Sequence, residues 1–445
     1  MTSPSGGTSV RIGIDGFNLA MAQGTGIATY ARVLSRCLTQ LGHPVDVLYG
    51  LPMSANASPI MREVAFFDRL DQEPRRAPDP VISARWWRER AAARRGCEAM
   101  EMPMTGLVDR RGFRMPDFDR ILNVSDLFQL AVRHFRQTRR FLRVRIPDGP
   151  AIMHWTYPLP IVVEGARNIY TVHDLVPLRL PHTTLDDKGY HLNLVRSCIA
   201  EGAAICTVSE ASRADILRVY PEAAGKVVNT YESIDLPEQA LPEAADLADF
   251  LGGVFGLVPR GYFLFFGALE PKKNIGRLLE AYLSAGTSAP LVLVGGRSWK
   301  AQSELRLLRL RASDQPGGPR IRRIDYLPFG TLLRLIRGAR AVLFPSLYEG
   351  FGLPVAEAMA LGTATLTSTE ASLPEIAGDA SVLVDPYDTE AIARGIRMLD
   401  QDEALRRRLE AAGPPQAARF GAAPYRAALT AMYADVMTKT PSGRR

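Results

Sequence analysis

The sequence has no long apolar run and contains few cysteines. Within its 445 residues, no apolar stretch reaches the roughly 18 residues that a membrane-spanning helix needs. Residues 1–15 lack a charged region followed by an apolar core, so we expect no signal peptide. Cys37, Cys97, Cys198 and Cys206 show no CxxC spacing, which predicts reduced thiols. These absences predict a soluble, cytoplasmic protein.

Lysine is also scarce, and the positive charge is unevenly spread. Only six of the 54 basic residues are lysines, and two of these, Lys272 and Lys273, are adjacent. The chain carries a net charge of +7, whereas residues 85–145 alone contain 15 arginines and 7 acidic residues, a net of +8. The basic character is therefore local, which bears on the choice of partners.

The length and the order of patterns predict two α/β domains. A chain of 445 residues can bury two cores, and 47% hydrophobic residues is ordinary for a globular protein. A buried strand at 10–14, a glycine-containing loop, a helix at 27–41 and a strand at 44–49 form a βαβ opening. A second parallel sheet is expected to begin at 262–266. The fold class is thus α/β with doubly wound parallel sheets.

The most informative stretch is residues 344–386. A buried strand ends there in a glycine loop, and Pro354 suits the first turn of the helix that follows. Free N–H groups at such a helix start favour an anion such as a diphosphate. Glu349 in the loop and Glu357, eight residues later, supply carboxylates that can accept hydrogen bonds from sugar hydroxyls. The alternative is that the glycines only make a turn and Glu357 only complements the helix dipole.

Two further positions fit the same chemistry. Lys272 and Lys273 precede a predicted helix that Asn274 can cap, an arrangement that makes sense if an anion lies between them and the helix. The alternative is a solvated surface pair. His173 follows a strand predicted at 168–172, and ligands bind outside the carboxyl ends of strands in open α/β sheets. A histidine hydrogen-bonded in a loop is the competing explanation.

These motifs resemble the retaining glycosyltransferases of family 4, especially the mannosyltransferase-like members. One part of the match is the pair Lys272 and Lys273, and another is the string YTVHDLVPL around His173. The third part is a glycine loop and the following helix start, with a glutamate in each. Its matching residues are Glu349, Gly350, Phe351, Gly352, Leu353, Pro354 and Glu357. The resemblance is close in the second half of the chain and covers the first half only near residues 24–26 and His173. Asp325 departs from it, because the family usually has a glycine there, and this leaves the base-binding wall undefined.

The resemblance implies a GT-B fold, in which two Rossmann-like domains face a cleft. The expected organisation is an acceptor-side domain at 1–240 with a basic insertion at 54–150, a linker at 241–260, a nucleotide-sugar domain at 261–420, and a crossover helix and tail at 421–445. It implies transfer of a sugar, best assigned as mannose from GDP-mannose, to a glycan or lipid-linked acceptor in polysaccharide biosynthesis. No metal or other cofactor is expected, and no nucleic acid.

The resemblance also assigns roles to residues. His173, Lys273 and Glu349 are expected to be catalytic: His173 reaches the sugar or the leaving diphosphate, Lys273 grips the diphosphate, and Glu349 contacts the sugar. Glu357 is expected to hold the ribose. The remaining donor-binding residues are expected to be Gly24, Gly26, Lys272, Gly350, Phe351, Gly352 and Leu353.

Other classes of protein remain open. Gly24 and Gly26 also fit a dinucleotide fingerprint with Asp46 as ribose ligand, which would indicate an NAD-dependent oxidoreductase, but the third glycine is replaced by Thr29. A UDP-sugar-dependent transferase and a non-catalytic nucleotide-sugar sensor are further alternatives. Asp117-Phe118-Asp119 matches a metal-binding triplet of the other large glycosyltransferase fold, and we discount it because such triplets arise often by chance.

The basic region suggests that the protein contacts the inner face of an anionic membrane. Residues 133–145 are expected to form a basic amphipathic helix, and aromatic side chains nearby could enter the interface. An ordinary solvated basic face explains the same pattern. The residues on which the hypothesis depends are Arg85, Arg88, Arg94, Arg133, Arg136, Arg139, Arg140, Trp86, Trp87 and Phe135.

Overall fold

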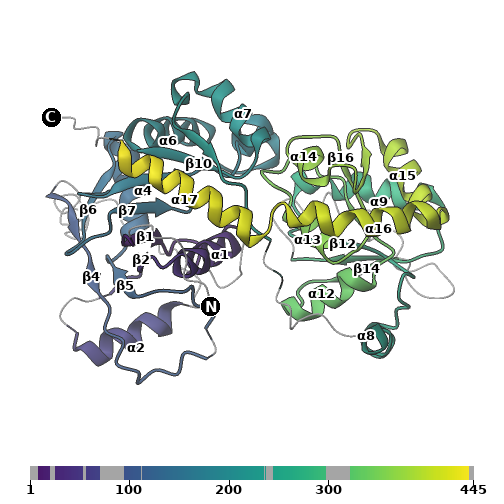
Figure 1. Cartoon of the computed structure of the whole chain (residues 1–445), viewed down its shortest axis with the longest axis horizontal. Coiled ribbons are helices and arrows are strands. Elements are labelled where there is room, and N and C mark those ends of the chain that lie inside the picture. The colour runs from purple at the N-terminus through teal and green to yellow at the C-terminus, as the bar shows by residue number, and fades with distance from the viewer. Residues whose placement is uncertain are drawn as a thin grey trace.

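The structure is a computed structural model, and it forms two α/β domains side by side (Figure 1). It describes residues 9–20, 26–53, 57–70, 95–111, 113–234, 236, 244–296 and 321–439. Six residues named above lie outside these ranges, and the expectations for them remain sequence-based predictions: Gly24, Arg85, Trp86, Trp87, Arg88 and Arg94.

The first domain is built on an eight-stranded sheet in the order β11-β10-β9-β7-β1-β2-β5-β4. Every neighbouring pair is parallel except β4 with β5. The central strands are fully buried, as parallel strands covered on both faces should be, and they are mostly apolar except for Asp15, Asp46 and His154. The strands are β1 Ile12–Asp15, β2 Val45–Tyr49, β4 Met100–Glu101, β5 Arg120–Asn123, β7 Ile152–Trp155, β9 Arg167–Thr171, β10 Ala204–Thr207 and β11 Val227–Asn229.

Helices and a small second sheet complete the first domain. The small sheet has the order β3-β6-β8, with β3 at Cys97–Glu98, β6 at Leu142–Arg145 and β8 at Ile161–Val163. The α-helices are α1 Gly26–Gln40, α2 Pro59–Leu70, α4 Leu127–Thr138, α5 Val176–Arg179, α6 Lys188–Glu201 and α7 Glu210–Val219.

The second domain has a six-stranded, wholly parallel sheet in the order β14-β13-β12-β15-β16-β17. Strands β12 and β15 are adjacent at its centre, so the loops after them lie at the same edge. The strands are β12 Phe263–Phe266, β13 Leu291–Val294, β14 Ile321–Ile324, β15 Ala341–Phe344, β16 Thr365–Ser368 and β17 Val382–Val384. The α-helices are α8 Ala244–Phe250, α9 Ile275–Ala285, α12 Phe329–Gly338, α13 Leu353–Ala360, α14 Leu373–Ala377 and α15 Thr389–Gln401.

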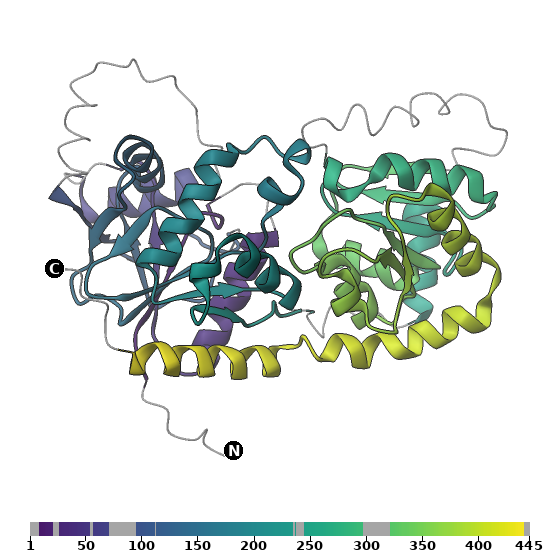
Figure 2. The same ribbon diagram turned by 90° about the horizontal axis from the view of Figure 1, so that it is seen from above.

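The last two helices run from the second domain back to the first. Helix α16, Glu403–Ala418, packs on the second domain, and α17, Ala422–Thr438, packs against α1 (Figure 2). The hydroxyl of Tyr433 lies 2.7 Å from His154 Nδ1 in the buried core of the first domain. The expected final helix and its return to the first domain are therefore present.

The structure corrects the expectation for the basic stretch. Only its first half is helical, because α4 ends at Thr138, and the rest forms strand β6, in which buried and exposed residues alternate. Phe135 is completely buried in the core of the first domain, packed against Phe141 and Tyr190. Phe135 cannot enter a membrane interface in this fold, so that part of the hypothesis is wrong.

Candidate active site

The site is organised by the loop between β15 and α13. Gly352 takes a left-handed conformation (φ 107°) at the N-cap, and Pro354 lies in the first turn of α13, as the sequence predicts. At Gly350, a Cβ atom would lie 2.5 Å from the carbonyl oxygen of His173 in the other domain. Only glycine permits this approach, so Gly350 is one of the points at which the two domains meet.

Three successive carbonyl groups of this loop are held by serine hydroxyls. The carbonyls of Glu349 and Phe351 accept from Ser372 at 2.9 and 2.8 Å, and that of Gly350 accepts from Ser209 at 2.6 Å. Within the described ranges, no group accepts from the backbone N–H groups of Gly350, Phe351 and Gly352. The serines therefore orient the loop so that its donors stay available to an anion at the start of α13.

Lys273 and Glu349 form a buried ion pair beneath the loop. Lys273 Nζ lies 2.6 Å from Glu349 Oε1 and also contacts the ring of Phe344. Lys272 Nζ lies 3.8 Å from the other Glu349 oxygen, 3.8 Å from Glu270 and 4.0 Å from Asp174 of the first domain. The adjacent lysines are thus part of the site rather than a solvated pair, and Lys272 links the two domains.

The charges in this cluster stabilise one another. Burial alone would raise the pKa of Glu349, but the positive charges of Lys273 and Lys272 outweigh it, so the pKa is lowered and the carboxylate is ionised. Burial alone would lower the pKa of Lys272, but Glu349, Asp174 and Glu270 raise it overall. A charged diphosphate arriving here meets Lys272 in its protonated form, with Lys273 beside it.

Glu357 lies in α13, and a second acid interacts with it. Burial raises the pKa of Glu357 to about 7. Glu232, only 6% exposed, has its pKa raised to about 8, first by burial and then by the charge of Glu357. Glu232 follows β11 and is fixed by its neighbours: Tyr231 packs on the ring of Phe420, and Ile234 N donates to the Phe420 carbonyl. The sequence analysis missed Glu232, because nothing local distinguishes it from a surface acid.

His173 comes from the first domain and is held in one protonation state. Its Nε2 lies 2.9 Å from the Thr156 carbonyl oxygen, which can only accept, so Nε2 carries the proton. Burial lowers the pKa of His173, and the ring is therefore neutral with Nδ1 as an acceptor. Asp15 accepts from Thr156 N and so anchors the loop that fixes this tautomer. Tyr30 packs edge-on against the ring.

The sequence also leads to expectations for three other residues, Gly26, Asn274 and Ser209. Gly26 begins α1, is exposed, and has no atom within 4 Å of its missing Cβ, so no contact links it to the loop. Asn274 occupies the N-cap position of α9 but does not cap it; its amide donates to the carbonyls of Pro345 and Pro386. Ser209 does cap α7, as expected, in addition to bonding Gly350.

Two alternative sites have structural roles. Asp46, 1% exposed, pairs with Arg11 at 2.8 Å and with Arg120 at 2.7 Å, which leaves it unavailable to a ribose. Asp119, of the discounted triplet, accepts from Val45 N at 2.7 Å and holds β2 in place.

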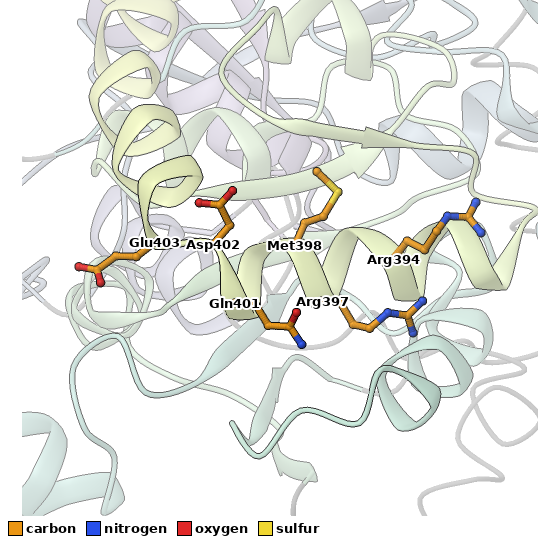
Figure 3. Close-up of a pocket in the computed structure, with 6 residues that line it drawn as sticks. All are labelled: Arg394, Arg397, Met398, Gln401, Asp402 and Glu403. Atoms are coloured by element: carbon orange, nitrogen blue, oxygen red, sulfur yellow. The ribbon is translucent and has the colours of Figure 1, made fainter.

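A surface depression of about 610 Å³ lies where α15 ends and α16 begins, and no residue of the loop lines it (Figure 3). Both arginines that line it are already paired, Arg394 with Asp388 and Arg397 with Glu390. It offers no cluster of free polar groups and is not a candidate for the chemistry.

Comparison with known proteins places this geometry in a family. Residues 258–415, which include the loop, Lys273 and both glutamates, match the family described as Glycosyl transferases group 1. These residues are a glycosyltransferase domain. The enzyme class expected from the sequence, a glycosyltransferase, is therefore confirmed for this domain.

The sequence relatives include O-antigen enzymes. The chain is 32% identical over 259 residues to O-antigen chain mannosyltransferase B of Escherichia coli, covering 57% of this chain and 66% of that protein. It is 30% identical over 275 residues to the serotype-specific mannosyltransferase WbdA of Escherichia coli, covering 60% of this chain and 33% of that one. The chain thus spans less than two thirds of the length of these relatives.

Solved structures confirm the GT-B fold. Sucrose-phosphate synthase from Thermosynechococcus elongatus superposes with a TM-score of 0.66 at 18% identity, covering 97% of this chain and all of that one. Anabaena Alr3699/HepE, solved in complex with UDP and glucose, superposes with a TM-score of 0.62 at 13% identity, covering 96% and 99%. At these identities the likeness concerns the fold alone.

Proposed function

We propose that the chain is a retaining hexosyltransferase of family 4 that transfers mannose from GDP-mannose to a glycan or lipid-linked acceptor in polysaccharide biosynthesis. The observation that carries this proposal is the convergence of three features at one helix start. These are the free N–H groups of the loop, the buried pair Lys273–Glu349, and Glu357 in the first turns of α13. A diphosphate, a sugar and a ribose each find a chemically suitable partner there.

The leaving group determines the role of the positive charges. When the bond between the anomeric carbon and the diphosphate breaks, negative charge builds on the departing oxygen. Lys273, Lys272 and the N–H groups of the loop lie where they can oppose that charge, and electrostatic stabilisation of this kind is usually the largest single contribution to lowering a barrier. This arrangement supports catalysis without a metal ion.

His173 is expected to contact either the donor sugar or the leaving diphosphate, and its tautomer favours the sugar. Nδ1 of the neutral ring can only accept a hydrogen bond, whereas a diphosphate oxygen needs a donor. A donor-sugar hydroxyl is therefore the suitable partner for His173. In the second domain, Glu349 accepts from another sugar hydroxyl once Lys273 turns to the diphosphate, and Glu357 accepts from the ribose.

The choice of mannose follows from the sequence relatives named as mannosyltransferases. A UDP-sugar is the second candidate donor, because one structural neighbour was solved with UDP and glucose. An oxidoreductase is disfavoured, because Asp46 is paired with two arginines and cannot serve as its ribose ligand.

We also propose that the enzyme docks on the inner face of an anionic membrane. Among the described helices, none is both long and apolar enough to cross a bilayer. Exposed arginines at the end of α4 and on the outer face of β6 keep their charge available for lipid headgroups. These are Arg136, Arg139, Arg140 and Arg145, whereas Arg143 is paired with Glu164 at 3.3 Å.

A donor screen tests the proposed function. Purified full-length protein is incubated with GDP-mannose, UDP-glucose or other nucleotide sugars, and nucleotide release is measured with and without a lipid-linked glycan acceptor. We expect release of GDP that depends on the acceptor. Release with UDP-sugars alone would replace GDP-mannose by the second candidate, and no binding of any nucleotide sugar would overturn the assignment.

A further inference from the structure

Helix α7 of the first domain is bound at its N-terminus by a side chain of the second. Glu375 on α14 accepts from the backbone N–H groups of Glu210 and Ala211, at 2.9 and 3.1 Å, one to each carboxylate oxygen. These N–H groups belong to the first turn of α7, where no backbone carbonyl can reach them. A helix is thus capped across a domain boundary by a charge that also complements its dipole.

The same turn of α7 holds the donor loop. Ser209 and Ser212 both donate to the Gly350 carbonyl, at 2.6 and 3.2 Å, and Ser212 also donates to the His173 carbonyl at 2.9 Å. On the other side, Ser372, three residues before Glu375, donates to the Glu349 and Phe351 carbonyls. The loop is therefore clamped between α7 and the segment that leads into α14.

A further contact lies along α7. The hydroxyl of Tyr348 donates to Asp215 Oδ2 at 2.7 Å, and Asp215 is itself 7% exposed. The residues that join α7 to the second domain thus flank the loop on both sides. Separating the domains would break the bonds of Glu375 to α7, of Ser209 and Ser212 to Gly350, and of Tyr348 to Asp215, and would withdraw His173 from the loop.

We propose that Glu375 is a positioning residue for glycosyl transfer, whose carboxylate couples domain closure to the geometry of the donor loop through α7. The proposal rests on the proposed function and adds to it a group that touches neither donor nor acceptor. In the proposed site the groups that bind a nucleoside diphosphate all come from the second domain, where Ser372 by itself holds two of the three loop carbonyls. Binding of the nucleoside diphosphate should therefore depend little on the clamp. Glycosyl transfer needs His173 beside the loop, and it therefore needs the clamp.

The test compares Glu375→Ala with Glu375→Gln in the full chain. Losing a helix cap shifts an equilibrium by roughly 2- to 30-fold, so Glu375→Ala should lower kcat by about that factor and leave the Kd of GDP unchanged. The amide oxygen of Glu375→Gln retains one acceptor and should restore part of kcat. Glu403→Ala is the matched control, because Glu403 lies in the first turn of α16 and is solvent-exposed with Arg407 as partner.

Two measurements report on the clamp without relying on activity. Hydrogen–deuterium exchange at the amides of Glu210 and Ala211 should be faster in Glu375→Ala than in Glu403→Ala. Small-angle scattering should show a larger radius of gyration for Glu375→Ala. Unchanged exchange and an unchanged radius would overturn the proposal, as would an equal loss of GDP affinity and kcat, which would indicate local damage to α14. If the wild type binds no nucleotide, the proposed function fails while these two measurements still test the clamp.

Discussion

Replacing Lys273 by alanine is the most direct test of the donor site. Its ammonium group lies 2.6 Å from Glu349 Oε1, and the residue is only 9% exposed. The proposed diphosphate carries negative charge in the bound donor and gains more in the transition state. Lys273→Ala should therefore weaken donor binding and slow transfer, with a loss of about 2.7–4 kcal/mol, or roughly 10²–10³ in rate, as for other preorganised groups.

A competing effect has a similar size and must be separated from the first. Removing one partner of a buried ion pair leaves the other charged and unpaired, which costs about 3–5 kcal/mol. In Lys273→Ala the carboxylate of Glu349 would keep only Lys272, at 3.8 Å. A loss of activity could then reflect a disturbed loop rather than a missing diphosphate contact.

The double variant Lys273→Ala/Glu349→Gln distinguishes the two effects. It removes the unpaired charge, so the loop should recover its stability, while the diphosphate contact is still absent. We expect GDP affinity, measured by calorimetry, to stay as low in the double variant as in Lys273→Ala. Glu349→Gln alone should retain GDP affinity and lose turnover, whereas Glu357→Gln should lose both.

Lys439→Ala is the control, because Lys439 forms an exposed ion pair with Asp435 that should contribute little. Recovery of GDP affinity in the double variant would refute a diphosphate role for Lys273. Equal weakening of GDP by Glu349→Gln and Glu357→Gln would refute the division between sugar and ribose.

Five further predictions concern pH, metal, membrane and the tautomer of His173. GDP affinity should fall as the pH drops below about 7, where Glu357 becomes protonated, and titration calorimetry should find this fall absent in Glu357→Gln, a comparison that cancels the titration of GDP itself. Because the pKa of Glu232 is raised to about 8 in the folded protein, the unfolding free energy of the wild type should fall as the pH rises from about 4.5 to 8. The unfolding free energy of Glu232→Gln should not show this fall. Turnover should survive exhaustive EDTA treatment, and a loss restored by manganese would contradict the proposed role of the lysines. Arg139→Glu/Arg140→Glu should reduce co-sedimentation with anionic vesicles severalfold, and equal binding to neutral vesicles would reject docking by charge. Asp15→Asn should loosen the loop that contains Thr156, so kcat should fall by a larger factor than KM changes. A change confined to thermal stability would show that Asp15 does not position His173.

The features that the sequence predicts well are those with a local cause. Strand β15 is a buried apolar run, Pro354 and Gly352 mark the start of α13, and Ser209 marks the start of α7, so each can be recognised within a few residues. The two sheets follow from the alternation of such elements. The spacing of Glu349 and Glu357 identifies the site because both flank one loop.

The features that it misses depend on residues far away in the chain. Asn274 has the right type and place for a helix cap, yet two carbonyls from Pro345 and Pro386 take its amide instead. Phe135 has the periodicity of an amphipathic helix, but Phe141, just before β6, and Tyr190 of α6 cover it. Glu232 becomes unusual only because the fold buries it and brings it near Glu357. In each case tertiary packing overrides a local pattern.

The charge balance of the site explains why the donor must reorganise it. Lys272 and Lys273 bring two positive charges, while Glu349, Asp174 and Glu270 bring three negative ones, so the cluster without donor already has its lysines engaged. The ammonium group of Lys273 has three N–H donors, so a diphosphate can bind it and thereby weaken its bond to Glu349. The same shift leaves the Glu349 carboxylate beside the sugar more available to accept a hydrogen bond from a hydroxyl group. Binding of the diphosphate and recognition of the sugar are therefore coupled through one ion pair, which is why removing Lys273 and removing the Glu349 charge should have different effects on GDP but similar effects on transfer.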